Sequence, residues 1–158
     1  MRTMRLFKQE LSDQETMEVL AAGTSGVLAV MGDEGYPYAV PLSYVYADGK
    51  IYFHGAKTGH KIDAIAKNEK VSFCVIDKDD VVPQEYTTYY KSVIVFGKAR
   101  ILDSAEEKKA ALKVLGEKYM PQYREGYLQE IETKAAHMSV MELTIEHMTG
   151  KQASELME

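Results

Sequence analysis

The sequence has a single cysteine, no tryptophan and no long apolar run. The lone Cys74 cannot form a disulfide within the chain, and no stretch approaches the roughly 20 apolar residues that a membrane-spanning helix needs. The N-terminal stretch MRTMRLFKQELSDQE is charged and lacks the apolar core of a secretory signal. We therefore expect a protein of the reducing cytoplasm with no membrane partner.

Positive charge and phosphate-binding motifs are also scarce. Nineteen Lys and Arg stand against 24 Asp and Glu, and the formal net charge of −5 opposes nonspecific attraction to nucleic acid. No G-x-G-x-x-G occurs, and the G-x-x-x-x-G-K-[ST] spacing counted from Gly55 fails at His60. These absences argue against a nucleic-acid partner and against nucleoside-triphosphate chemistry, so any basic site must be local.

Helix caps and alternating apolar residues predict one α+β domain over residues 1–158. Ser12-x-x-Glu15 and Ser104-x-x-Glu107 are capping boxes, and each is expected to open a helix. Alternation predicts strands at 24–31, 36–47, 50–55, 71–77, 92–102 and 137–151. Helical patterns predict helices near 12–22, 60–67, 122–135 and from Ser104 up to Pro121.

Several single residues refine this prediction. Asp48-Gly49 is a hairpin signal, and two prolines, Pro37 and Pro41, make the second strand an edge or a bulged strand. Gly97 suggests a bulge within its strand. Residues 78–87 are polar and are expected to form a loop. Cys74 lies in an alternating strand and is expected to be a small core residue.

The segment IYFHGAKTGHKIDAIAKNEKVSFCVID, residues 51–77, passes from a strand through a glycine-rich turn into a helix. Backbone amides at the start of a helix, beside the positive end of its dipole, form a site for anions. Lys57 and Lys61 could add charge to such a site. The alternative is that Gly55 and Gly59 only make a turn and that the lysines are solvated.

Three segments together resemble a known family. They are GVLAVMGDEGYPYAVPLSYVYADGKIYFHGAKTGHKIDAIAKNEKVSFCVID, YKSVIVFGKARIL and HMTGK, and the similarity covers roughly residues 12–150. The chain resembles the FMN-binding split-barrel proteins of the pyridoxamine 5′-phosphate oxidase-like superfamily, and most closely the Nim-type group named for nitroimidazole resistance. The resemblance implies a six-stranded antiparallel split β-barrel with flanking helices, and a homodimer with flavin bound at the subunit interface.

The resemblance also assigns residues to the flavin. Main-chain groups along the isoalloxazine ring would come from Pro41, Leu42, Ser43 and Tyr44. The ribityl and phosphate end would be lined by Phe53, His54, Gly55, Ala56 and Lys61. The partner subunit would supply Tyr90, Lys91, Ser92 and Val93. No metal site is expected, because His60, His137 and His147 lack metal-ligand spacing.

These assignments predict an FMN-dependent oxidoreductase, with FAD as an alternative cofactor, NAD(P)H as electron donor and a small electron-poor molecule such as a nitroaromatic as substrate. True pyridoxamine phosphate oxidase activity is not expected, because the family's tryptophan- and arginine-containing substrate motif has no counterpart here. Two alternatives stay open: a noncatalytic flavin carrier or sensor, and a haem-binding split barrel with His54 as ligand. His54 could also only satisfy a core hydrogen bond, and no catalytic residue is identified.

Overall fold

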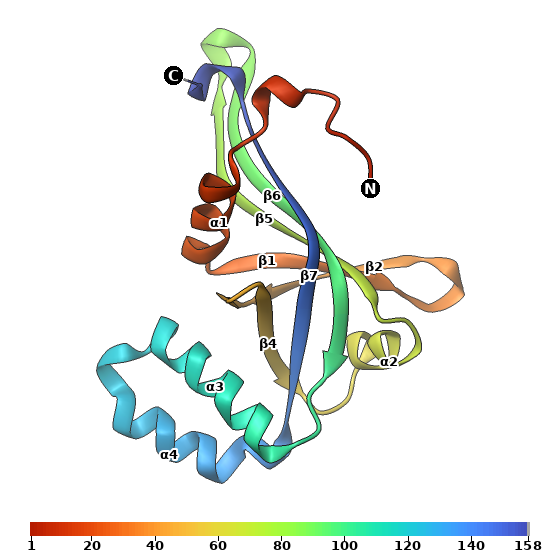
Figure 1. Ribbon diagram of the computed structural model, residues 1–158, viewed down its shortest axis with the longest axis vertical. Coiled ribbons are helices and arrows are strands. Elements are labelled where there is room, and N and C mark those ends of the chain that lie inside the picture. The colour runs from red at the N-terminus through yellow and green to blue at the C-terminus, as the bar shows by residue number, and fades with distance from the viewer. Residues whose placement is uncertain (158) are drawn as a thin grey trace.

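A seven-stranded antiparallel sheet forms the centre of the computed structural model, which describes residues 1–157 (Figure 1). The strands are β1 (Ser25–Met31), β2 (Pro37–Ser43), β3 (Val45–Ala47), β4 (Lys50–Ala56), β5 (Lys70–Val82), β6 (Thr87–Ile101) and β7 (Met138–Gln152). The helices are α1 (Asp13–Ala22), α2 (His60–Lys67), α3 (Ala105–Tyr119) and α4 (Arg124–Lys134). The α+β prediction is confirmed.

The strand order is β2-β1-β5-β6-β7-β4-β3, so two strands that follow one another in the chain occupy opposite edges of the sheet. β2 and β3 are joined through Tyr44 alone, an arrangement consistent with a split barrel. The predicted count of six strands is wrong, because the expected strand at 36–47 is broken at Tyr44. The Tyr44 amide donates to the Tyr119 hydroxyl at 3.1 Å instead of to a neighbouring strand.

The long hairpin of β5 and β6 replaces the loop expected at 78–87. β5 continues past a register shift at Ile76 and pairs with β6 as far as Val82 and Thr87. A short 3-10 turn, η3 (Pro83–Glu85), closes the hairpin, with Tyr86 in the left-handed conformation at φ 55°. The prediction failed here because backbone pairing holds this polar segment, whose side chains are largely exposed on both faces.

Most local signals are confirmed. The Ser12 hydroxyl accepts from the Glu15 amide, and the Glu15 carboxylate accepts from the Ser12 amide at 2.9 Å. Asp48 and Gly49 turn the β3–β4 hairpin with φ values of 48° and 78°. The Ser104 box forms only in part, because the Glu107 carboxylate pairs with Arg100 in β6 instead.

The buried apolar side chains form two separate hydrophobic cores. The main core lies between the sheet, α1 and α2, and contains the fully buried Leu28, Phe53 and Phe73. A second core lies beneath α3 and α4, where Leu112 and Ile131 face Val140 of β7. Figure 1 shows the α3–α4 hairpin beside β4 and away from α2. None of the helices in residues 1–157 is long and apolar enough to cross a membrane.

Candidate functional site

The turn between β4 and α2 places one lysine against the backbone of a glycine. Gly59, at φ 150°, precedes α2, and no side chain caps the helix. Lys61, in the first turn, folds back so that its Nζ lies 3.5 Å from where a Cβ of Gly55 would be. The missing side chain at Gly55 leaves room beside the amine, and no carboxylate within residues 1–157 forms an ion pair with Lys61. These groups fit a phosphate.

The other polar residues of this segment face elsewhere. The Lys57 amine donates to the main-chain oxygen of Ala136 at 3.2 Å. His60 accepts a hydrogen bond from the Asp33 amide at 3.3 Å, and its ring lies 4.1 Å from the ring of Tyr38, centroid to centroid. His60 therefore holds the β1–β2 turn, and Lys61 is the cation that this turn presents beside Gly55.

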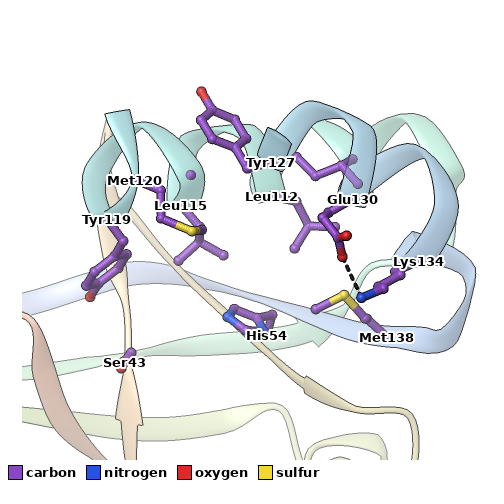
Figure 2. Close-up of a pocket in the computed structure, with 12 residues that line it drawn as sticks. Ser43, His54, Leu112, Leu115, Tyr119, Met120, Tyr127, Glu130, Lys134 and Met138 are labelled. Atoms are coloured by element: carbon purple, nitrogen blue, oxygen red, sulfur yellow. Dashed lines mark ion pairs between the residues drawn. The ribbon is translucent and has the colours of Figure 1, made fainter. Parts of the chain in front are cut away.

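His54 faces a cavity between the sheet and the α3–α4 hairpin. Phe53 before it is fully buried in the main core, so alternation along β4 turns His54 to the opposite face. The cavity has a volume of about 330 Å³, and Figure 2 shows the imidazole pointing from β4 toward the helices. Its lining is mainly apolar and includes Leu112, Leu115, Tyr119, Met120, Ile131 and Met138.

Charge in this cavity is balanced. Desolvation lowers the pKa of His54 from its ordinary value, which favours the neutral imidazole. The only oppositely charged pair drawn in Figure 2 is that of Lys134 with Glu130, at 2.5 Å. The exposed Ser43, at the end of β2, reaches the same cavity. The structure thus brings together two predicted site residues, Ser43 and His54, in an apolar space.

Residues 41–44 lie on a free edge of the sheet, but they differ in whether their groups are accessible to a ligand. Pro41 and Ser43 are exposed, and β2 has no strand partner on its outer side, so main-chain groups there are open to a ligand. Leu42 packs on the main core. The Tyr44 ring is fully buried, and its main-chain oxygen accepts from both Lys118 and Tyr119.

Residues 90–93 lie far from the turn that holds Lys61. Val93 pairs with Gly150 of β7, whereas His54 pairs with Val140, ten residues away along the same strand. At about 3.3 Å per residue, the positions at which His54 and Val93 pair with β7 lie roughly 33 Å apart along that strand. Val93 is buried in the main core, while Ser92 is half-buried on the opposite face. One chain does not bring the two halves of the predicted site together.

The sheet face opposite the main core carries apolar side chains that sequence reasoning missed. It exposes Val27, Met31, Ile76, Ile94 and Phe96, and we call it the outer face. Cys74 pairs with Val27 and with Ile94, so it lies on the outer face, and its expected core position is wrong. Burial raises the pKa of its thiol, which disfavours a thiolate. The runs VLAVM and VIVF, apolar at every position, are the signal that a strand is covered on both sides.

Lys118 and Tyr119 were also missed, because helix periodicity does not show which strand a helix end will reach. Within residues 1–157, no group of three His, Cys, Asp or Glu side chains is placed to hold a metal ion.

An antiparallel sheet whose consecutive edge strands stay apart, with a lysine-bearing turn beside one of them, is consistent with the split-barrel class. Residues 12–152 match the sequence model described as pyridoxamine 5′-phosphate oxidase, and the chain belongs to that family. The resemblance expected from the sequence is confirmed. No functionally curated protein matches the sequence itself.

Three solved structures have similar folds. A candidate 5-nitroimidazole antibiotic resistance protein from Bacteroides thetaiotaomicron superposes with a TM-score of 0.78 at 22% identity, over 90% of this chain and 86% of that one. An FAD-binding protein from Mesorhizobium loti gives 0.62 at 28% identity, over 92% and 97%. An FAD- and haem-binding protein from Mycobacterium smegmatis gives 0.77 at 19% identity, over 92% and 74%.

Proposed function

We propose that the protein is a flavin-binding oxidoreductase that uses FMN. The observation that carries this proposal is the Lys61 amine beside Gly55, at the uncapped start of α2. A phosphate monoester there would gain a cation and backbone amides, and the free edge of β2 offers main-chain groups to a flat ring. The Mesorhizobium loti and Mycobacterium smegmatis proteins, both named as binding FAD, support a flavin.

The site is proposed to be shared between two copies of the chain. Its two halves lie at separate places along β7, so a second subunit is needed to set residues 90–93 against the Lys61 turn. The outer face supplies the surface for that contact, because Ile94 and Phe96 are 45% and 38% exposed. Large apolar side chains gathered on one face of a sheet are typical of interaction sites.

Bound flavin supplies the redox chemistry, so the chain has to bind it, orient it and limit access of water. We propose NAD(P)H as electron donor and a small electron-poor molecule, such as a nitroaromatic, as acceptor. The neutral His54 and the apolar cavity beside Ser43 are suited to an uncharged substrate. No role in proton transfer is assigned to His54.

The absorption spectrum of protein purified without added cofactor tests the proposal first. A flavin spectrum that bleaches anaerobically with NAD(P)H supports a reductase, whereas flavin that is retained without turnover supports a carrier or sensor. A preparation that neither contains flavin nor binds added FMN would contradict the proposal.

Lys61→Ala tests the phosphate contact. FMN affinity should fall about 10- to 100-fold, as expected for a charge-assisted hydrogen bond, while riboflavin affinity should change little. Lys67→Ala, in the last turn of the same helix, is the matched control and should bind FMN as the wild type does. An equal loss for FMN and riboflavin would place Lys61 away from the phosphate.

Haem binding is a second candidate, favoured by a specific observation. The neutral imidazole of His54 faces an apolar cavity, which suits an iron ligand, and one similar structure is named as binding haem. A Soret band that disappears in His54→Gln would establish it.

A further inference from the structure

A polar groove, separate from the apolar cavity that His54 faces, lies on the outer face beside the N-terminal segment. This segment is fixed to the sheet in two ways. Glu10 and Lys151 form an isolated backbone β-bridge, beside which the Leu11 amide donates to the Gly150 oxygen at 2.9 Å, and the Gln9 side chain accepts from the Tyr90 hydroxyl at 2.9 Å. Residues 2–4 then border a groove of about 270 Å³ over β6 and β7.

The groove combines positive charge with hydroxyl groups. Arg2 and Lys151 supply two cations, and the hydroxyls come from Thr3, Ser92 and Thr149. No acidic residue lines it, and neither cation takes part in an ion pair within residues 1–157. In a chain with a net charge of −5, two unpaired cations on one groove form a local site for an anion.

The arrangement favours an anion that belongs to a larger molecule. Ile94 and Met4 give the groove apolar surface beside its charges. The Lys151 amine lies 5.3 Å from the centroid of the Tyr90 ring, which holds the amine over an aromatic face at one side of the groove. Two cations and three hydroxyls suit a diphosphate better than a single carboxylate, because a diphosphate offers several charged acceptor oxygens.

We propose that this groove binds the diphosphate of an ADP moiety, the group that FAD and NAD(P)H share. The inference rests on the proposed function, since Ser92 belongs to the wall that one subunit offers to its partner's flavin. In FAD one of the two phosphates is the riboflavin phosphate that Lys61 is proposed to hold, so a flavin dinucleotide would bring only its adenosine phosphate to the groove, whereas NAD(P)H would bring both phosphates. The N-terminal segment thereby becomes part of the binding site through Arg2.

ADP binding to the full chain, measured by calorimetry at low salt, tests the groove directly. Lys151→Gln and Arg2→Gln should each weaken ADP binding about 10-fold or more, the loss expected for one charge-assisted contact. Lys98→Gln is the control, because Lys98 lies further along β6 and pairs with Glu69 instead. ADP affinity that is unchanged in both groove variants, or reduced equally in the control, would overturn the proposal.

Two further arms identify the source of the ADP moiety. If Lys151→Gln weakens FAD but not FMN, the groove serves a flavin dinucleotide. If ADP competes with NAD(P)H on flavin-loaded protein, it serves the electron donor. ADP binding by a protein that takes up no flavin would support the ADP site and contradict the proposed function. Flavin binding without ADP binding would contradict the ADP site alone.

Discussion

The Lys118 amine donates a hydrogen bond to the main-chain oxygen of Tyr44 at 3.1 Å, and lies 4.4 Å from the centroid of the Tyr44 ring. The same amine donates to the main-chain oxygen of Gly23, where α1 ends. Desolvation lowers the pKa of Lys118, and no acidic side chain in residues 1–157 is paired with it. The last turn of α3 therefore fixes the break between β2 and β3.

Lys118→Met should lower the free energy of unfolding by about 1–3 kcal/mol, because the Gly23 oxygen loses a donor and the Tyr44 oxygen keeps only the Tyr119 hydroxyl. Urea denaturation measures the loss. Lys113→Met, at an exposed position of the same helix, is the control and should change stability by less than about 0.5 kcal/mol. Equal stability of the two variants would show that the contact contributes nothing.

Gly116→Ala should destabilise the fold, whereas Gly55→Ala should leave its stability nearly unchanged. A Cβ on Gly116 would lie 2.6 Å from ring carbons of the buried Tyr127 and would push α3 from α4, at a cost of about 1–3 kcal/mol. A Cβ on Gly55 would meet only the end of Lys61 at 3.5 Å, so the fold should tolerate it. Urea midpoints compare the two, and a destabilised Gly55→Ala would contradict the packing described here.

The pH dependence of stability should report the environment of His54. Its pKa in the folded protein is lowered below the ordinary value of 6.5, so the unfolded chain binds more protons in the window below 6.5. The free energy of unfolding should therefore fall as the pH decreases through that window. His54→Gln should lose less stability between pH 7.5 and 5 in urea titrations. Parallel curves for the two proteins would place His54 in an ordinary aqueous environment.

Local chemistry was enough to predict most elements of the fold. The Ser12 cap, the Asp48-Gly49 turn and the proline-bearing edge strand each depend on residues close in sequence, and each is confirmed. The break at Tyr44 could not be predicted in this way. It depends on Lys118 and Tyr119, which lie 74 and 75 residues away in the chain.

The candidate site was predictable only in part. The Gly55 and Lys61 pairing follows from a turn whose partners lie six residues apart, and the structure brings them together. The cavity facing His54 is lined by Leu112 of α3, Ile131 of α4 and Met120, which directly follows α3, and nothing within the β4 sequence indicates that these helices fold over it. Residues 90–93 need a second chain in the proposed site, and no pattern within one chain can fix where that chain sits.

Phe96→Glu should weaken self-association. In a two-fold dimer formed through the outer face, each substitution acts twice, and burying an unpaired carboxylate should raise the dissociation constant at least about 30-fold. Analytical ultracentrifugation measures the change. Tyr123→Glu, at a 66% exposed position near α4, is the control for added charge. A Phe96→Glu protein that associates as tightly as the control would exclude the outer face as the interface.

The proposed sharing of one flavin site between two subunits is tested most directly by mixing two variants that are each expected to bind FMN poorly. In the proposed site, Lys61→Ala damages the turn of one subunit, and Ser92→Trp damages the wall that the partner would supply. After subunit exchange, a mixed dimer holds one doubly damaged site and one intact site, so about a quarter of all sites should recover wild-type FMN affinity. Fluorescence titration of the mixture against each variant alone counts these sites. No recovery in a mixture proven to contain mixed dimers would contradict a site built from two chains.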